Sequence, residues 1–224
     1  MYKYFFKRFF DLFFSFIALC ILSPLLIPIT IGLLLTGEHY VFYFQKRIGY
    51  RNKPFFIWKF ATMLKNSPNM GSGLHTTRKD PRILPMGDFL RKTKINELPQ
   101  IINILKGDMS IVGPRPLVDK TFDPYPDHVK AVIYNVKPGL TGIGSIIFRD
   151  EERLLSETKL PVQDFYKSHI SPYKGDLELW YQKHRGFYTD FMLIFLTAWV
   201  ILAPKSQLVY QIFKDLPERP KELK

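Results

Sequence analysis

The segment from Asp80 to Pro116 carries residues whose types and spacing suit the binding of phosphate groups. It reads DPRILPMGDFLRKTKINELPQIINILKGDMSIVGPRP, with glycines and prolines spaced between basic side chains. The basic residues near these turns are Arg82, Arg91, Lys92, Lys106 and Arg115. Arg115 lies between two prolines, which restrict its backbone. Its guanidinium can donate to two phosphate oxygens at once. The segment predicts an anion-binding site, although a Pro-Arg-Pro sequence taken alone is more often a surface turn.

The net charge of the whole chain also favours an anionic partner. Lysine and arginine total 32 and aspartate and glutamate total 20, which gives a formal net charge of +12. Nucleic acid, anionic lipid headgroups and phosphorylated substrates would each suit this charge. Because the basic residues lie on Pro and Gly turns and the sequence contains no recognisable nucleic-acid-binding module, we expect no nucleic acid partner.

An apolar run near the N-terminus predicts a membrane element. From Leu12 to Thr36 about 25 residues carry no charge, which is long enough for a helix to cross a hydrocarbon layer. Ser23 and Pro24 lie at its centre and Pro28 follows one turn later, and because proline removes an amide donor we expect a sharp kink. Basic residues flank both ends, namely Lys3, Lys7 and Arg8 before the run and Lys46, Arg47, Arg51 and Lys53 after it.

This charge pattern assigns both ends of the apolar run to the cytoplasmic side, because positively charged flanks stay in the cytoplasm. A re-entrant hairpin helix, which enters and leaves the membrane by the same face, satisfies both the charge pattern and the central prolines. A simple spanning anchor with a proline kink is the open alternative.

The rest of the chain combines short aromatic strands with helices. Runs at 39–45 and 55–60 are rich in aromatic and β-branched residues and predict a β-hairpin. Helices are expected at 88–94 and 97–106, so that they meet near Asn96 and Glu97. Residues 66–81 are rich in Ser, Gly, Asn and Thr and predict a surface loop.

The C-terminal part contains one more apolar segment. Phe191 to Ala203 is apolar for about 13 residues, too few to span a membrane, and suits an interfacial helix or a buried core helix. Beyond it, we expect residues 206–224 to form a tail whose charged end, from Lys214 on, is frayed.

Several of these motifs together resemble a family of bacterial sugar transferases, the monotopic phosphoglycosyl transferases. The resemblance runs through QKRIG at 45–49, FFIWKFATM at 55–63, the segment at 80–117, VKPGLTG at 136–142 and YTDFMLIFLTAWVIL at 188–202. The family inserts a re-entrant helix broken at a Ser-Pro pair, which Ser23 and Pro24 match, so the resemblance favours the hairpin over the anchor.

The predicted fold is therefore a helix-dominated α/β (α+β) unit with a small β-hairpin, an N-terminal re-entrant membrane helix and interfacial amphipathic helices. Residues 1–38 would form the membrane helix, 39–205 the catalytic domain and 206–224 the tail. The resemblance implies a location on the cytoplasmic face of the bacterial inner membrane, in contact with membrane lipids.

The resemblance also implies a reaction: transfer of a sugar-1-phosphate from a UDP-sugar to polyprenyl (undecaprenyl) phosphate, with Mg²⁺ and release of UMP, to prime glycan synthesis. Donor and acceptor phosphates repel one another, so a basic site with a divalent cation must neutralise them before they approach. The candidate substrate-binding residues are Lys59, Arg91, Arg115 and Arg149. No metal ligands are assigned.

The sequence departs from the family pattern at the nucleophile. The typical motif has Asp-Glu before Leu-Pro-Gln, and its aspartate is the nucleophile that also meets the metal. This chain has Asn96 and Glu97 there. A neutral amide is a poor nucleophile and a weak Mg²⁺ ligand. Glu97 could act as nucleophile or base itself, a neighbouring carboxylate could replace the missing one, or the chain could be a membrane-bound scaffold that binds substrates without turning them over.

An acidic cluster after Gly142 is a candidate for the replacing carboxylate. The chain reads GIGSIIFRDEERLL there, with Asp150, Glu151 and Glu152 beside Arg149, in place of the usual family continuation. One hypothesis is that the cluster supplies a metal ligand or an acid-base group that compensates for Asn96. The competing interpretation is a solvated charged turn or helix start, which a charge run usually is.

Overall fold

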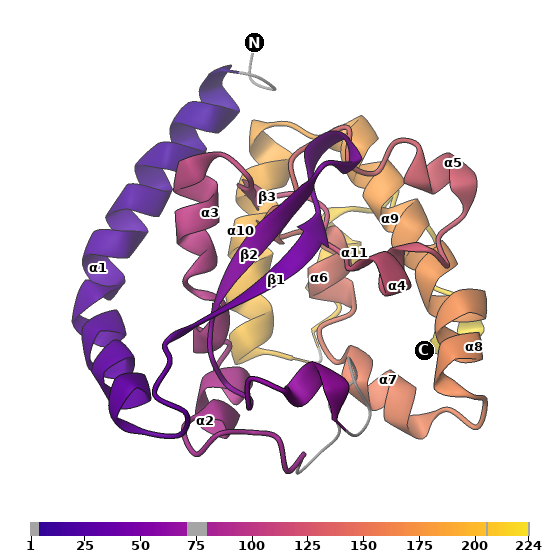
Figure 1. Cartoon of the computed structure of the whole chain (residues 1–224). Helices are drawn as coiled ribbons and strands as arrows, with labels where there is room; N and C mark the ends of the chain where they lie inside the picture. The colour runs from indigo at the N-terminus through magenta and orange to yellow at the C-terminus, as the bar shows by residue number, and fades with distance from the viewer. Residues whose placement is uncertain (1–4, 71–79, 205, 224) are drawn as a thin grey trace. The chain divides into compact units, whose positions relative to one another are not determined.

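A computed structural model describes residues 5–70, 80–204 and 206–223, apart from the side chains of residues 68 and 152 (Figure 1). Helices dominate this part of the chain, and its strands form two small two-stranded sheets. The helix-dominated α/β (α+β) prediction with small sheets is confirmed at this level. Residues 71–79, the middle of the predicted surface loop, lie outside the described residues, as does Lys3.

The helices are α1 (Lys7–Leu35), α2 (Gly87–Lys92), α3 (Gln100–Lys106), α4 (Asp119–Phe122), α5 (Asp127–Lys130), α6 (Ile143–Ile147), α7 (Glu151–Glu157), α8 (Val162–Phe165), α9 (Ser171–His184), α10 (Phe187–Leu202) and α11 (Leu208–Ile212). Short 3₁₀ turns are η2 (Tyr50–Asn52), η3 (Ser67–Asn69), η4 (Ile95–Glu97) and η6 (Lys221–Leu223), and η5 (Tyr166–Ile170) is a π-helical turn. The strands are β1 (Phe42–Ile48), β2 (Pro54–Phe60), β3 (Ser110–Val112) and β4 (Gly139–Thr141).

The chain divides into two compact units. The larger unit comprises residues 1–11, 47–55 and 107–224, and the smaller unit comprises residues 12–46 and 56–106. Each unit has hydrophobic clusters of its own. These units are defined by which residues pack together. Their boundaries therefore differ from the predicted functional divisions at residues 38 and 205.

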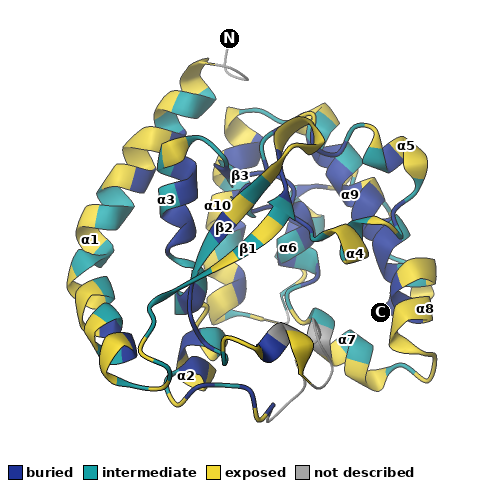
Figure 2. Cartoon of the chain, in the orientation of Figure 1, coloured by how far each residue is buried: buried dark blue, intermediate teal, exposed yellow. Residues whose placement is uncertain are grey.

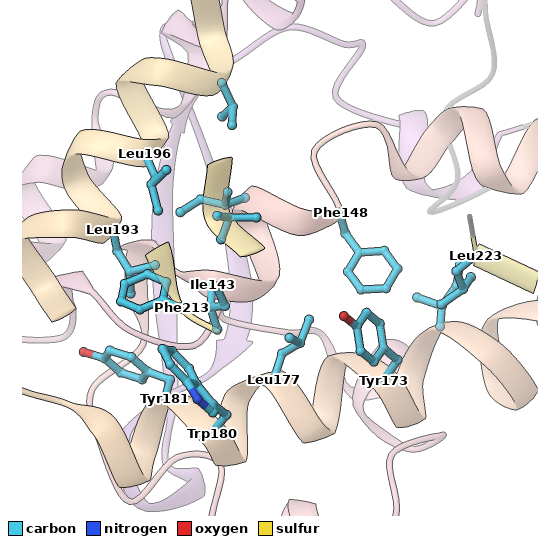
Figure 3. Packing of buried hydrophobic residues seen from close by; sticks show 14 of the residues in the cluster. Ile143, Phe148, Tyr173, Leu177, Trp180, Tyr181, Leu193, Leu196, Phe213 and Leu223 are labelled. Carbon is cyan, nitrogen blue, oxygen red and sulfur yellow. The ribbon is translucent and has the colours of Figure 1, made fainter. Parts of the chain in front are cut away.

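The main core of the larger unit forms around α9 and α10. Leu177 from α9, Leu193 and Leu196 from α10, and Ile143 from α6 are completely buried there, and Figure 3 shows their side chains within one cluster. Burial of apolar side chains contributes about 1.5–3 kcal/mol for each large one, so this cluster holds the three helices together.

The C-terminal segment completes that core. Val209, Phe213 and Leu223 are buried, and Phe213 and Leu223 lie among the cluster residues in Figure 3. Trp180 donates its indole N–H to Asp215 at 2.9 Å. The expectation of a frayed end from Lys214 on is therefore wrong for residues 214–223, because Leu223 packs into the core and Asp215 is bound by Trp180.

Helix α10 has two apolar faces. Leu193, Leu196 and Val200 are buried, whereas Phe191 and Ile201 on the other side are exposed, as the mixed colouring of α10 in Figure 2 shows. The core-helix interpretation is thus correct for one face. The opposite face leaves a row of large apolar side chains exposed, which is the pattern that an interfacial helix requires.

Helix α1 runs without interruption through its two prolines and curves along its length (Figure 1). Pro24 has no amide to donate to the carbonyl oxygen of Cys20, and the hydroxyl of Ser23 donates to that oxygen instead, at 2.8 Å. Among the described residues, α1 is the one helix long and apolar enough to cross a membrane, by length and composition. The re-entrant hairpin stays a prediction.

The predicted hairpin is present, with strands shifted by a few residues. β1 and β2 pair in one sheet and are joined at Gly49, whose amide donates to the carbonyl of Lys53 at 2.9 Å. Arg51 and Asn52 in the turn have left-handed φ angles of 55° and 58°. Asparagine adopts this conformation more readily than most residues, which explains why a tight turn forms here.

Candidate functional site

Glu97 and Lys59 form a salt bridge in the smaller unit. The ammonium nitrogen of Lys59 lies 2.9 Å from Oε1 of Glu97, and the two side chains are 14% and 15% exposed. Lys59 comes from β2, and Glu97 ends the η4 turn between α2 and α3. The resemblance drew attention to Lys59 and Glu97 in two separate motifs, and in the structure their side chains are in contact.

Buried Asn103 of α3 fixes the strand that carries Lys59. Its Oδ1 accepts from the amide of Trp58 at 2.9 Å, and its Nδ2 donates to the carbonyl of Phe56 at 2.8 Å. Because a side-chain amide binds the strand backbone at two alternate residues, β2 cannot slide along α3. The position of Lys59 opposite Glu97 follows from this register.

The turn that carries Glu97 is determined locally. Lys94, two residues after the end of α2, precedes η4 with a left-handed φ of 60°, and the amide of Glu97 donates to the carbonyl of Lys94 at 3.1 Å. Pro99 then precedes α3, in a position where its missing amide costs no helical hydrogen bond. The prediction that two helices meet near Asn96 and Glu97 is confirmed.

Asn96 is buried and only partly satisfied. Within the part of the chain that the structure describes, its Oδ1 accepts no hydrogen bond. Leaving such an oxygen buried without a donor costs about 1–3 kcal/mol, so the free energy favours a ligand group there. Asn96 and Glu97 are consecutive residues of the η4 turn, and each carries an oxygen that can bind a cation, the amide oxygen more weakly than the carboxylate.

These two residues fit the Mg²⁺ that the family resemblance implies. Mg²⁺ usually takes one or two protein oxygens and obtains its remaining ligands from substrate phosphates and water. No group of three or more His, Cys, Asp or Glu side chains suited to hold a metal occurs among the described residues. Mg²⁺ stays a prediction.

Arg91 and Arg82 of the smaller unit differ in what holds them. The guanidinium of Arg91 contacts the sulfur of Met63 at 3.7 Å. Arg82 is buried, donates to both carboxylate oxygens of Asp80 at 2.8 and 2.6 Å, and also donates to two backbone carbonyls. Arg82 thus stabilises its own turn, and Arg91 remains the candidate for phosphate binding.

Arg115 of the larger unit projects from a fixed backbone. β3 and β4 are parallel, with Ser110 opposite Gly139. The amide of Gly113 donates to the carbonyl of Thr141 at 2.9 Å, which extends this pairing to the edge of the Pro-Arg-Pro turn. Arg115 itself is exposed, whereas both flanking prolines are buried.

The glycines of the two motifs are required by this close approach. A Cβ atom on Gly113 would lie 2.4 Å from the carbonyl oxygen of Lys137, and one on Gly139 would lie 2.1 Å from the amide of Gly113. No side chain larger than hydrogen fits at such distances. The GPRP and KPGLTG motifs are therefore two halves of one structure that positions Arg115.

Tyr134 supports the same turn and was not found from the sequence. Its hydroxyl donates to the carbonyl of Arg115 at 2.8 Å and accepts from the amide of Leu117 at 2.9 Å. Burial raises the pKa of this hydroxyl well above its usual value, so it remains a donor at physiological pH. A tyrosine among apolar residues gives no such signal in the sequence.

The described members of the acidic cluster after α6 differ in their surroundings. Asp150 is exposed, and Glu151 lies with its Oε2 2.6 Å from the ammonium nitrogen of Lys174. The side chain of Glu152 lies outside the described residues. Arg149 has a buried guanidinium nitrogen, Nη1, without a hydrogen-bond partner in the described chain. The salt bridge favours a structural interpretation of Glu151, and the compensation hypothesis remains untested.

The first turns of α1 bind β3 within the larger unit. Lys7 donates to Asp190 at 2.6 Å and to the carbonyl of Val112 at 3.0 Å. Asp11 accepts from the amide of Ile111 at 2.9 Å and from the hydroxyl of Ser110 at 3.0 Å. Lys7 was expected only as a charge that flanks the apolar run, although the acidic Asp11 beside that run was a signal for a buried contact.

A cation on a fixed turn and a partly buried Lys59–Glu97 pair are features that suit a protein that binds phosphorylated ligands. A family model described as bacterial sugar transferase matches residues 2–204, and the chain belongs to this family. The resemblance inferred from the motifs is thereby confirmed.

Individual relatives agree with the family assignment. The chain is 32% identical over 212 residues to an undecaprenyl-phosphate galactose phosphotransferase of Salmonella typhimurium, covering 88% of this chain and 40% of the relative. It is 34% identical over 195 residues to a UDP-glucose:undecaprenyl-phosphate glucose-1-phosphate transferase of Escherichia coli, covering 86% and 39%. It is 38% identical over 159 residues to the exopolysaccharide production protein ExoY of Sinorhizobium fredii, covering 65% and 70%. The chain thus spans less than half the length of the first two.

Proposed function

We propose that this protein transfers a sugar-1-phosphate from a UDP-sugar to polyprenyl phosphate, such as undecaprenyl phosphate, releasing UMP and starting the synthesis of a lipid-linked glycan. The observation that carries the proposal is the Lys59–Glu97 salt bridge, which lies in a turn whose preceding residue, Asn96, has a buried oxygen without a donor in the described chain. The names of the Salmonella and E. coli relatives, which specify undecaprenyl phosphate as acceptor, support it.

Glu97 is the carboxylate best placed to take part in the reaction. The transfer breaks the bond between the sugar-bearing phosphorus and the oxygen that this phosphorus shares with UMP. Glu97 would attack that phosphorus or accept a proton from the attacking group. Lys59, 2.9 Å away, orients the carboxylate and places a positive charge where negative charge gathers on phosphate oxygens.

Asn96 would have a different role from the aspartate that the family motif usually has. Its amide cannot serve as a nucleophile, but its Oδ1 lacks a donor and can ligate a cation. Mg²⁺, when bound, would neutralise phosphate oxygens, and Asn96 and Glu97 are the residues that would hold it. Arg91, Arg115 and Arg149 would bind the phosphate groups of donor and acceptor.

The lipid acceptor requires a location at the membrane. The apolar helix α1 would enter the cytoplasmic leaflet of the inner membrane as a re-entrant helix, with its bend near Ser23 and Pro24. The hydroxyl of Ser23 supports a place in lipid for this segment, because it satisfies the carbonyl that Pro24 leaves without a donor; the re-entrant path itself rests on the family resemblance. The exposed apolar face of α10 would lie at the lipid interface.

A non-catalytic scaffold is the second candidate, and Asn96 is the observation that favours it. Incubating the detergent-solubilised protein with polyprenyl phosphate, Mg²⁺ and a panel of UDP-sugars, then measuring UMP, separates the two candidates. We expect the natural protein to release UMP from at least one UDP-sugar and a chelator to abolish release. If only the Asn96→Asp variant releases UMP, the natural chain is a scaffold.

The acidic cluster has its own test. Replacing Asp150, Glu151 and Glu152 together by alanine should leave the dependence of turnover on Mg²⁺ unchanged, because Asn96 and Glu97 hold the metal in this account. If the Mg²⁺ dependence shifts strongly in that triple variant while the Asn96→Asp variant behaves like the natural protein, the cluster is the metal site.

A further inference from the structure

Arg149 lies in a tight turn between α6 and α7. The amide of Glu151 donates to the carbonyl of Phe148 at 3.2 Å, which closes a four-residue turn with Arg149 and Asp150 at its centre. Phe148 is buried, and its amide donates to the carbonyl of Gly144 at 3.0 Å. The direction of the Arg149 side chain therefore depends on how the two ends of this turn are held.

Lys174 of α9 holds both ends. Its ammonium nitrogen lies 2.6 Å from Oε2 of Glu151 and 5.0 Å from the ring centre of Phe148. It also lies 5.6 Å from the ring centre of Tyr166, and its side chain is 11% exposed. A shielded ammonium group between a carboxylate and two aromatic faces makes strong cation–π and ionic contacts with little competition from water.

Glu178, one helical turn after Lys174, holds the start of the same segment. Its buried carboxyl accepts from the backbone amide of Gly144, at the start of α6. A Cβ atom on Gly144 would lie 2.6 Å from Oε1 of Glu178, so the carboxyl and the helix backbone are in close contact. Two residues on one face of α9 thus bind the segment from Gly144 to Glu151 at both of its ends.

The guanidinium that this arrangement directs is incompletely satisfied. Nη1 of Arg149 is buried and has no hydrogen-bond partner in the described chain. A charged donor buried without an acceptor is unfavourable unless a ligand supplies one. An anionic oxygen is the acceptor that matches a guanidinium best.

We propose that Lys174 is a positioning residue for Arg149: by holding Phe148 and Glu151, it directs the guanidinium toward a phosphate oxygen of a substrate. The inference rests on the proposed function, since both the UDP-sugar and the polyprenyl phosphate carry such oxygens. It assigns Glu151 to substrate affinity through Lys174 rather than to metal binding.

A double-mutant cycle in the full-length, detergent-solubilised protein tests this. Lys174→Met keeps much of the side-chain volume and removes the charge, and it is made in the natural protein and in the Arg149→Ala variant. The KM for the UDP-sugar and the KM for polyprenyl phosphate are measured separately, with kcat, so that the substrate that Arg149 binds is identified. Lys183→Met, an exposed lysine on the same helix, is the matched control.

We expect Lys174→Met to raise one of the two KM values about tenfold. The same change in the Arg149→Ala background should alter that KM by less than about twofold, because the residue through which Lys174 acts is gone. Lys174→Arg should restore most of the affinity, and Lys183→Met should leave it unchanged. If Lys174→Met does not fold, Glu151→Gln in the same two backgrounds removes the ionic contact alone and should show the same dependence on Arg149.

Equal effects in both backgrounds, or a loss confined to kcat, would overturn the positioning role and leave the proposed function intact. A natural protein that neither binds UDP nor releases UMP would overturn both. The two failures are therefore distinguishable.

Discussion

Two lysine–glutamate salt bridges of similar geometry lie in different parts of this chain. Lys59 and Glu97 are 2.9 Å apart in the smaller unit, with side chains 14% and 15% exposed. Lys174 and Glu151 are 2.6 Å apart in the larger unit, with side chains 11% and 28% exposed. Distance and burial alone would give both pairs the same role.

Their surroundings separate them. Lys174 also contacts two aromatic rings, so its ammonium is held by neighbours within the chain. Glu97 follows Asn96, whose buried Oδ1 lacks a donor in the described chain. The turn beside the Lys174–Glu151 pair also has, among the described residues, an unsatisfied buried atom, Nη1 of Arg149. That atom is a donor and suits an anionic oxygen, whereas Oδ1 of Asn96 is an acceptor and suits a cation. The kind of unsatisfied atom, and not the ion pair, therefore indicates which ligand each place could take.

The largest expected effect comes from replacing the two lysines in the same way. Lys59→Met should lower kcat about a hundredfold, because the positive charge that stabilises the reacting phosphate is lost. Lys174→Met should change kcat by less than about threefold and act on KM instead. Steady-state UMP release at saturating substrates gives kcat, and UMP release over a range of substrate concentrations gives KM. Equal losses of kcat in the two variants would show that the two salt bridges do not differ in role.

Arg115, like Lys174 and unlike Lys59, is expected to act on substrate binding. Arg115→Lys keeps the charge but loses the two-oxygen geometry of the guanidinium, so we expect KM for one substrate to rise about tenfold with little change in kcat. The exposed Arg153 provides the control, since Arg153→Lys should leave both constants unchanged. A loss of kcat without a change in KM would place Arg115 among the reacting groups instead.

The backbone that carries Arg115 should be sensitive to a single methyl group. Gly113→Ala places a Cβ atom against the carbonyl of Lys137 and should cost about 1–3 kcal/mol of unfolding free energy. Gly186→Ala is the matched control, because the nearest heavy atom to its Cβ lies 3.9 Å away, and it should change stability by less than about 0.5 kcal/mol. Denaturant unfolding of both variants measures the difference, which equal stabilities would contradict.

Glu178, beside Lys174, should give the larger unit a pH-dependent stability. Burial raises the pKa of Glu178 from 4.5 to about 8. Between these values the folded protein holds a proton that the unfolded chain has released, so stability falls as the pH rises through this window. Glu178→Gln cannot titrate, so its Tm should fall less than that of the natural protein between about pH 5 and about pH 8. Parallel Tm curves would show that Glu178 ionises normally.

Local features of the fold were predictable from the sequence, and distant pairings were not. The hairpin and the helices that meet near Glu97 follow from turn residues and side-chain periodicity within a few positions. The parallel pairing of β3 with β4 and the contact of Lys7 with Asp190 join segments far apart in the chain. No local pattern encodes which distant residue fills a given space.

The candidate site shows the same limit. Its residues were predictable because the motifs resemble a family, but the partners that position them were not. Lys174 and Tyr134 look in the sequence like an ordinary surface lysine and an ordinary core tyrosine. The C-terminal tail was wrongly expected to fray because its charges were weighed above the apolar residues between them.

Whether Glu97 is the reacting carboxylate is tested by the release of UMP from a UDP-sugar in the presence of polyprenyl phosphate and Mg²⁺, for the natural protein, Glu97→Gln and Glu151→Gln. We expect Glu97→Gln to lower turnover about a thousandfold or more. We expect Glu151→Gln to keep kcat within about threefold, with a raised KM. If Glu97→Gln turns over like the natural protein while Glu151→Gln is inactive, the reacting carboxylate lies in the acidic cluster and the account is wrong.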